Sequence, residues 1–312
     1  MTDSPLAIEA TGLRKMFGVR VAVDSIDLRV PCGQIYGLIG PDGAGKTTTI
    51  RMLCGVIELS GGGGRVAGLD IVREREAMKE RIGYMSQRFS LYPDLTVIEN
   101  LRFFADLFAV TRQERAKLIP YLLEFSGLTD FQERLAGLLS GGMKQKLALA
   151  CTLIHRPEVL FLDEPTTGVD PVARREFWRI LYGLLKQGVT VFVSTPYMDE
   201  AARCQTIAFM SEGRILAAAD PRELQRGLAE TVIELDARPL EQARTLARSM
   251  PGVSSVQAFG TLLHVLSADP LATEAALGPG LRAAGVEVIS IARTLPSVED
   301  VFIAMTEKKG EG

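Results

Sequence analysis

The stretch GPDGAGKTT at residues 40–48 decides how the rest of the sequence is interpreted. It fits the pattern G-x-x-x-x-G-K-[ST], whose glycines let successive backbone N–H groups close on phosphate oxygens at the start of a helix. The preceding residues, Gln34–Ile39, predict a short strand, and Ile50 and Leu53 recur at helical spacing after the stretch. Because strand, glycine loop and helix follow in this order, we predict a phosphate-binding loop and not an ordinary turn.

The residues of this loop have separate predicted roles. Lys46 is expected to reach the β- and γ-phosphates of a nucleoside triphosphate, and the Thr47 hydroxyl is expected to bind Mg²⁺. The other predicted nucleotide contacts of the loop are Gly40, Asp42, Gly43, Ala44, Gly45 and Thr48.

A second element of a nucleotide site follows a predicted buried strand. Residues 159–162 read VLFL, a continuous apolar run typical of a strand buried on both faces, and Asp163 and Glu164 come directly after it. In phosphate-loop enzymes such an aspartate holds the Mg²⁺ shell, and an adjacent glutamate polarises the attacking water. We therefore predict that Asp163 binds metal and that Glu164 is catalytic; the alternative is a pair of acids that only cap a helix.

The third element is LSGGMKQ at residues 139–145, a polar glycine corner that opens the helix leading to the Asp163 strand. With it, the sequence resembles the nucleotide-binding subunits of ATP-binding cassette (ABC) transporters over about residues 6–220. In that family LSGG is the signature, and residues 40–48 and 160–164 match the Walker A and Walker B motifs. The resemblance implies ATP and Mg²⁺ as cofactors. It also implies that the signature residues contact the ATP of a partner cassette; these residues are Ser140, Gly141 and Gly142.

The resemblance assigns three further residues. Gln87, in GYMSQ at residues 83–87, matches the Q-loop glutamine, which contacts Mg²⁺, takes part in catalysis and couples to the membrane subunit. Asp170 matches the aspartate of the D-loop. Phe17 lies where an aromatic ring usually stacks on adenine, although an aromatic residue at a strand end is also ordinary core.

Finer similarity indicates exporters of the ABC-2 type, including drug-resistance ATPases. PSVEDVF at residues 296–302 and YPDLTVIENL at residues 92–101 resemble motifs of those subunits. The spelling of residues 41–43, PDG, and of residues 141–147, GGMKQKL, resembles the N-terminal cassette of two-cassette YbhF-type multidrug exporters. The resemblance implies ABC-2 type transmembrane permease subunits as partners, a second cassette, and a peripheral location at the cytoplasmic face of the cell membrane.

One position departs from the family pattern. Where the family has Ser-Thr-His, with a switch histidine that hydrogen-bonds the γ-phosphate, residues 194–196 read Ser-Thr-Pro. Proline offers neither a side-chain donor nor a backbone N–H. The only two histidines, His155 and His264, lie elsewhere in the sequence and are predicted to be structural. Losing one preorganised contact to a transition state typically costs about 2.7–4 kcal/mol, or 10²- to 10³-fold in rate.

The substitution at Pro196 predicts an impaired site in this chain, unless a water or Ser194 compensates. Because the signature is intact, we expect a dimer of cassettes, preferably a heterodimer with a histidine-bearing cassette and otherwise a homodimer. The alternative function is a non-catalytic ATP-binding dimerisation subunit that supports a partner's hydrolysis.

Strands that alternate with helices predict an α/β fold, a P-loop NTPase of the ABC ATPase type. We place this nucleotide-binding domain at residues 1–221, with a helical subdomain at about 88–140, and expect the glycine run 61–64 to be a flexible turn. Residues 222–312 show the order β-α-β-β-α-β, which predicts a small α+β ferredoxin-like module.

Length and composition agree with this division and exclude other classes. The length of 312 residues suits two domains, and 35 basic against 38 acidic residues leave no basic excess for a nucleic-acid partner. The four cysteines form no C-x-x-C pair, which favours reduced thiols in the cytosol. Apolar runs are too short to span a membrane, so partners are expected to supply the spans. A DNA-repair or chromosome-structuring ATPase would need a long coiled coil between Lys46 and Ser140, and a two-cassette translation factor would need a second phosphate loop.

Overall fold

The computed structural model describes residues 5–88 and 91–310. The chain folds into two compact units, one ending at Ala218 and the other beginning at Ala219. The boundary predicted from the sequence, after residue 221, lies close to this division. No helix among the described residues is long and apolar enough to cross a membrane.

The core of the first unit is a six-stranded sheet with the order β10-β9-β3-β8-β7-β6. Its strands are β3 (Ile35–Ile39), β6 (Ile82–Met85), β7 (Val159–Asp163), β8 (Thr190–Thr195), β9 (Thr206–Ser211) and β10 (Arg214–Ala219). β3 pairs in parallel with β8 and β9, and β7 pairs in parallel with β6 and β8. Every residue of β3, β7 and β8 is buried, as the continuous apolar runs predict. Because parallel strands end at one edge, the residues that follow β3, β7 and β8 meet there.

A second sheet of the first unit has the order β2-β1-β4-β5. Its strands are β1 (Leu6–Phe17), β2 (Arg20–Pro31), β4 (Gly61–Val66) and β5 (Leu69–Asp70). The glycine run 61–64 is therefore part of a strand, and the expectation of a flexible turn was wrong. A Cβ atom at Gly62 would lie 2.1 Å from the carbonyl oxygen of Gly12, and one at Gly64 would lie 2.7 Å from that of Glu9. At Gly62 and Gly64 the backbone of β1 approaches too closely for a side chain.

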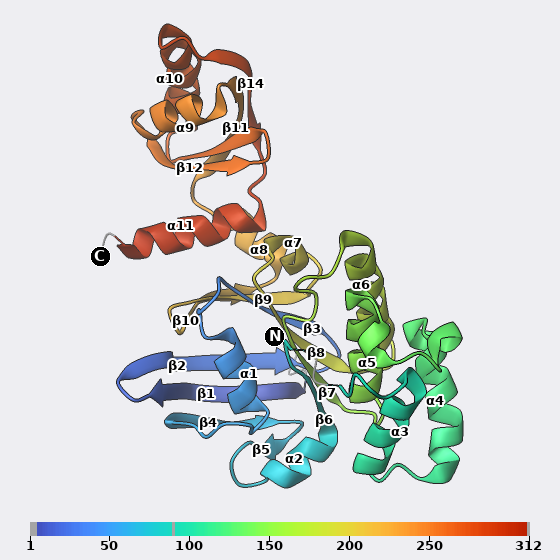
Figure 1. The fold of residues 1–312 in the computed structure, drawn as a ribbon. Helices are drawn as coiled ribbons and strands as arrows, with labels where there is room; N and C mark the ends of the chain where they lie inside the picture. The colour runs from blue at the N-terminus through green and yellow to red at the C-terminus, as the bar shows by residue number, and fades with distance from the viewer. Residues whose placement is uncertain (1–4, 89–90, 311–312) are drawn as a thin grey trace. The chain divides into compact units, whose positions relative to one another are not determined.

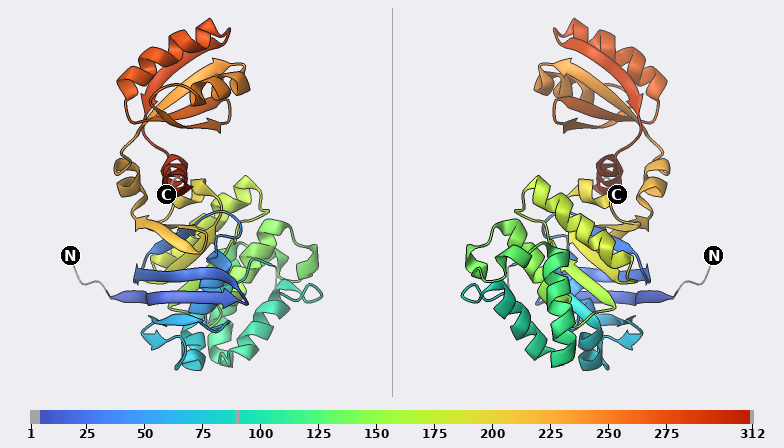
Figure 2. Two further views of the ribbon diagram at one scale, coloured as in Figure 1. Left: turned by 90° about the vertical axis from the view of Figure 1, so that its left-hand side faces the viewer. Right: turned by 90° about the vertical axis from the view of Figure 1, so that its right-hand side faces the viewer.

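Helices cover the central sheet. They are α1 (Lys46–Leu53), α2 (Arg75–Arg81), α3 (Val97–Leu107), α4 (Arg112–Ser126), α5 (Gly141–Thr152), α6 (Pro171–Leu185) and α7 (Met198–Ala201). Within this unit, α3 to α6 gather on one side and the β1-β2-β4-β5 sheet lies on the other (Figure 1; Figure 2 shows the same grouping from two sides). A capping box between Thr111 and Glu114 begins α4, and the helix continues through Pro120. A second capping box, between Thr96 and Glu99, begins α3.

The second unit is a four-stranded antiparallel sheet with two helices against its core. It contains α8 (Pro221–Arg226), β11 (Thr231–Arg238), α9 (Leu240–Arg248), β12 (Val253–Phe259), β13 (Leu262–Ser267), α10 (Pro270–Ala283), β14 (Glu287–Thr294) and α11 (Val298–Gly310). From β11 to β14 the elements follow the β-α-β-β-α-β order that the sequence predicts for a ferredoxin-like module, and the strand order is β12-β13-β11-β14. Buried residues from β11, β12, β13, α9 and α10 form its own hydrophobic core.

Candidate nucleotide site

The glycine loop joins the end of β3 to the start of α1 and lies tightly against its neighbours. A Cβ atom at Gly40 would lie 2.1 Å from the carbonyl oxygen of Met210, and one at Gly45 would lie 2.6 Å from that of Ala22. Gly45 also has φ of 108°, in the left-handed region that favours glycine. These two glycines are therefore required by the course of the backbone.

Lys46 is almost fully buried, with 3% of its surface exposed, and its ammonium group has three oxygen partners. Nζ donates to the carbonyl oxygens of Gly40, at 2.8 Å, and Pro41, at 3.0 Å. It also forms an ion pair with Oε1 of Glu164 at 3.2 Å. The lysine predicted to bind phosphate and the glutamate predicted to be catalytic are therefore in direct contact.

Asp163, at the carboxyl end of β7, is held through one oxygen only. Its Oδ1 accepts hydrogen bonds from Oγ1 of Thr47, at 2.9 Å, and Oγ of Ser194, at 2.8 Å. Its Oδ2 is buried and has no hydrogen-bond partner among the described residues. An unpartnered carboxylate oxygen beside a threonine hydroxyl is a donor set that suits Mg²⁺, so the residues present fit the predicted metal.

Glu164 has an unusual backbone and a crowded carboxylate. Its φ of 50° lies in the left-handed region, which is sparsely populated by residues other than glycine and is frequent at functional sites. Its N–H faces both the carbonyl oxygen and the hydroxyl of Ser194, each at 3.1 Å. Nε2 of Gln87 donates to Oε2 at 2.9 Å. The three predicted catalytic residues, Lys46, Gln87 and Glu164, therefore meet at one carboxylate.

A pocket of about 360 Å³ opens over the loop. It is lined by Phe17, Arg20, Ala22, Gly43, Gly45, Lys46, Thr47, Thr48 and Glu164. Phe17 is 52% exposed, and the Lys15 ammonium lies 5.1 Å from the centre of its ring. The aromatic ring is therefore available to a flat ligand. Three predicted contacts of the loop are not part of this lining: Asp42 is exposed, and Gly40 and Ala44 are buried.

The carboxyl end of β8, which we call its exit, differs from that of β7 in the hydrogen-bonding groups that it offers. The Thr195 hydroxyl donates to Oε2 of Glu200 at 2.7 Å, and the Ser194 hydroxyl is used by Asp163. Pro196 follows, with no group that can donate a hydrogen bond. Ser194, which sequence reasoning considered only as a possible substitute for histidine, instead connects Asp163 and Glu164.

Neither histidine belongs to this site. Nε2 of His155 is 2.8 Å from the carbonyl oxygen of Ile82, and its ring stacks on Phe108. Burial lowers the pKa of His155. His264 belongs to the second unit, where its Nδ1 lies 3.0 Å from Asp300, and this hydrogen bond raises its pKa. Both have the local packing roles expected of structural histidines.

The signature residues form a separate corner beside Asp170. Ser140 caps α5 by accepting from the N–H of Met143 at 3.3 Å, and Asp170 caps α6 by accepting from the N–H groups of Val172 and Ala173. Gly142 is buried, and a Cβ atom there would lie only 2.5 Å from that of Ala173, so the position requires glycine. Ser140, Gly141 and Asp170 are exposed and do not line the Lys46 pocket.

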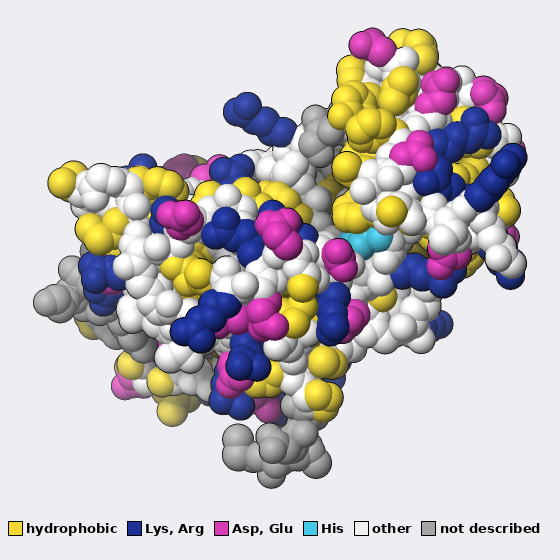
Figure 3. All heavy atoms as spheres, turned by 90° about the horizontal axis from the view of Figure 1, so that it is seen from below, with side chains coloured by type: hydrophobic (Ala, Val, Ile, Leu, Met, Phe, Trp, Pro, Cys, Tyr) yellow, Lys and Arg dark blue, Asp and Glu magenta, His cyan; other side chains and the backbone are white. Residues whose placement is uncertain are grey.

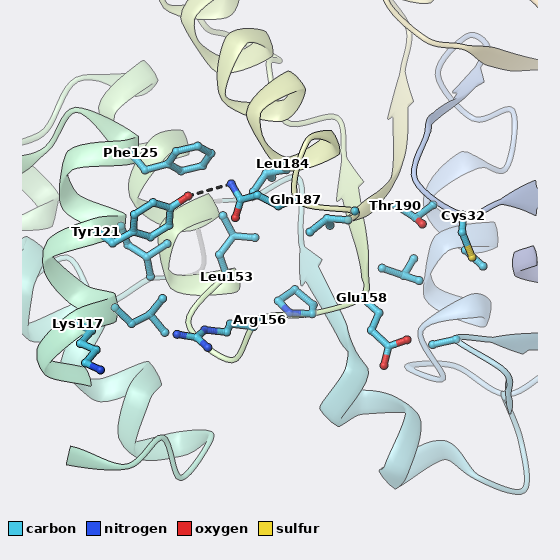
Figure 4. Close-up of a pocket in the computed structure, with 18 of the residues that line it drawn as sticks. Cys32, Lys117, Tyr121, Phe125, Leu153, Arg156, Glu158, Leu184, Gln187 and Thr190 are labelled. Carbon is cyan, nitrogen blue, oxygen red and sulfur yellow. Dashed lines mark hydrogen bonds between the residues drawn. The ribbon is translucent and has the colours of Figure 1, made fainter. Parts of the chain in front are cut away.

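A larger cleft, which we call the α4 cleft, lies at the opposite end of β7 and β8. Its volume is about 800 Å³, and its walls come from α4, the end of α6 and the segments that lead into the strands. Figure 4 shows Tyr121 and Phe125 on the α4 side, Cys32 and Thr190 on the sheet side, and the hydrogen bond of 2.9 Å from Gln187 to the Tyr121 hydroxyl. The α4 cleft is lined by none of the residues that are predicted to bind the nucleotide.

A family profile matches part of the first unit, and relatives match nearly the whole chain. The sequence profile described as "ABC transporter" matches residues 23–167. DrrA of Streptomyces peucetius, a daunorubicin/doxorubicin resistance ATP-binding protein, is 36% identical over 318 residues, which cover 98% of this chain and 94% of DrrA. The chain belongs to the ABC transporter ATP-binding family.

Other relatives of this ABC cassette support the same family assignment. The protein named "Probable multidrug ABC transporter ATP-binding protein YbhF" from Escherichia coli K12 is 42% identical over 308 residues, which cover 97% of this chain and 52% of YbhF. This chain thus spans about half the length of the YbhF relatives that it matches. Among solved structures, cbiO1 from Clostridium perfringens, described as part of the ABC transporter complex cbiONQ, has a TM-score of 0.66 at 25% identity, covering 71% of this chain and 91% of that one. The predicted family and the ABC ATPase fold are confirmed.

Proposed function

We propose that this ABC cassette binds ATP in the Lys46 pocket and hydrolyses it slowly, in order to drive export through separate membrane subunits. The contact of Lys46 and Gln87 with the carboxylate of Glu164, beside Asp163 and Thr47, carries the proposal. The names of the relatives, which include drug-resistance and multidrug ATP-binding proteins, support export as the direction.

Binding begins with an exchange of partners at Lys46. Its ammonium now pairs with Glu164 and two loop carbonyls. The β- and γ-phosphates of ATP offer a stronger, doubly charged acceptor, so the ammonium turns to them and releases Oε1 of Glu164. Phe17 stacks on the adenine through its exposed ring.

Mg²⁺ would be held by Thr47, Asp163 and Gln87 and would neutralise charge on the phosphates. Asp163 contributes its unpartnered Oδ2. Gln87 connects this group of residues to Glu164 through its amide.

In the hydrolytic step, Glu164 accepts a proton from the attacking water once Lys46 has left it. No side chain at position 196 donates to the γ-phosphate, because the residue is proline. Ser194 is engaged with Asp163 and Glu164 and is thus poorly placed to compensate. The site is therefore complete for binding and lacks one stabilising contact for turnover, which makes it slow.

The exposed signature corner implies a second cassette. Ser140 and Gly141 lie outside the Lys46 pocket, so they serve a nucleotide bound to another chain. A heterodimer with a histidine-bearing cassette would place a competent site opposite this signature, whereas a homodimer would contain two slow sites.

The helical subdomain offers a surface for ABC-2 type permease subunits. Tyr92, Phe103 and Leu107 are 47%, 37% and 64% exposed, and the rings of Tyr92 and Phe103 pack edge to face. The α4 cleft provides a second, partly apolar recess between the subdomain and the sheet (Figure 4). Docking on these surfaces would keep the cassette at the cytoplasmic face of the membrane. Basic and acidic side chains are interspersed on the face shown in Figure 3, which does not suit a nucleic acid.

The alternative function is a non-catalytic ATP-binding subunit that only supports a partner's hydrolysis. Pro196 favours it specifically, because binding residues are retained while a turnover contact is lost. Measuring ATP affinity and single-turnover hydrolysis separately on the purified chain distinguishes the two: slow but Glu164-dependent hydrolysis supports the proposal, and tight binding without hydrolysis supports the alternative. Co-purification from membranes then identifies the permease and any histidine-bearing cassette; recovery without membrane subunits would contradict the transport role.

A further inference from the structure

Glu200, in the short helix α7, is the carboxylate that the proposed reaction does not use, yet it is fully buried next to the site. Its Oε1 accepts from the Thr166 hydroxyl at 2.7 Å and from the Trp178 indole N–H at 3.1 Å. Its Oε2 accepts from the Thr195 hydroxyl at 2.7 Å. Nε of Arg174 adds an ion pair at 3.6 Å.

These partners come from three different segments of the first unit. Thr166 lies two residues after Glu164, and Thr195 immediately precedes Pro196. Trp178 and Arg174 belong to α6, whose N-cap is Asp170. One carboxylate therefore connects the Glu164 loop, the exit of β8 and the helix that begins at the D-loop position.

Stability alone gives a poor reason for this arrangement. Removing a carboxylate from water is costly, and well-packed apolar side chains of similar volume often serve as well or better. A fully satisfied buried network does, however, hold its members in one relative position. The Glu164 loop needs such a constraint, because Glu164 itself has a sparsely populated backbone conformation.

We infer that Glu200 is a positioning residue, which holds the Glu164 loop and the segment at position 196 in one position relative to α6. ATP turnover therefore depends on Glu200, whereas ATP binding does not. This inference rests on the proposed ATPase function. It assigns no contact between Glu200 and the nucleotide, since its oxygens are occupied by Thr166, Trp178 and Thr195.

The test compares Glu200→Gln with wild type and with Asp199→Asn. The glutamine keeps the shape and can still hydrogen-bond, but it loses the charge that orders the network. Asp199, which directly precedes Glu200, is the matched control. It forms an ion pair with the same Arg174 at 3.6 Å, but its side chain is 65% exposed. We expect kcat of Glu200→Gln to fall at least tenfold with KM and ATP affinity within twofold of wild type, and Asp199→Asn to match wild type. Thr195→Val removes the hydrogen bond that the Thr195 hydroxyl donates to Glu200 and the one that it accepts from the Tyr197 N–H, while Glu200 keeps its other partners. We expect a smaller change in the same direction, and this variant replaces Glu200→Gln if that variant does not fold.

Hydrogen–deuterium exchange without nucleotide provides a readout that does not need turnover. We expect Glu200→Gln to exchange faster in residues 164–168 and 194–199 and to match wild type across residues 40–53. If wild type shows no hydrolysis, the ATPase proposal fails, and exchange alone then decides the positioning role. The inference is overturned if Glu200→Gln keeps kcat within twofold of wild type, if its KM and affinity change as much as kcat, or if exchange in the two segments is unchanged.

Discussion

The exits of β7 and β8 lie side by side and differ in chemistry. The two strands are parallel neighbours, with Asp163 paired to Ser194 in register. After β7, Asp163 and Glu164 meet a threonine hydroxyl, an ammonium and an amide. After β8, the hydroxyls of Ser194 and Thr195 are used within the protein, and Pro196 has nothing to donate.

This difference separates two tasks that one nucleotide site performs. The groups that we propose to hold phosphate and metal follow β3, β6 and β7, and they lie in contact with one another. The contact missing at the exit of β8 would act mainly on the charge that develops during hydrolysis. A cassette of this kind is therefore expected to bind ATP well and to release phosphate slowly.

The largest effect is expected at the exit of β7. Glu164→Gln should reduce the remaining single-turnover rate by about 10²- to 10⁴-fold, because it removes the proposed general base. ATP affinity should persist, since Lys46 and Thr47 are intact. Phosphate release from labelled ATP measures the rate. Glu158→Gln, an exposed acid just before the same strand, should behave as wild type. Equal single-turnover rates for Glu164→Gln and wild type would show that Glu164 is not the general base. The chemical difference between the residues after β7 and those after β8 would then not affect catalysis.

A smaller effect is expected from a substitution in the loop after β3. Lys46→Met should weaken ATP binding by about 10- to 100-fold, because charge-assisted hydrogen bonds to the phosphates are lost. Isothermal titration calorimetry measures the affinity, and a melting curve checks that Gly40 and Pro41, left without their donor, do not unfold the loop. Lys186→Gln, at the exposed end of α6, is the control. Undiminished affinity in Lys46→Met would place the nucleotide elsewhere.

The smallest effect concerns the base and not the phosphates. Phe17→Ala should weaken ATP binding by about fivefold, since stacking on a half-exposed ring contributes modestly. Inorganic tripolyphosphate should bind Phe17→Ala and wild type equally. Val19→Ala, at a position that is 99% exposed, should change neither affinity. If tripolyphosphate lost as much affinity as ATP, Phe17 would belong to the fold and not to adenine recognition.

Sequence alone predicts what is encoded by neighbouring residues. The loop at 40–48, the acids after β7 and the corner at 139–145 are short stretches, and the parallel sheet that they require is present. The order of elements in the second unit also follows from local periodicity.

Features that depend on distant backbone were not predictable in the same way. The glycine run 61–64 suggested a turn because nothing local shows that β1 lies against it. The roles of Ser194 and Glu200 arise from partners as far apart in sequence as Asp163, Thr166 and Trp178. Such contacts leave no spacing pattern, so only the folded chain reveals them.

The most direct test of an impaired site is the ATP turnover of the purified chain beside that of Pro196→His. An imidazole at this position restores a donor toward the γ-phosphate, so we expect kcat to rise by about 10²- to 10³-fold with ATP affinity within twofold. A wild-type chain that already hydrolyses ATP at full transporter-like rates, with no gain from Pro196→His, would contradict the central claim.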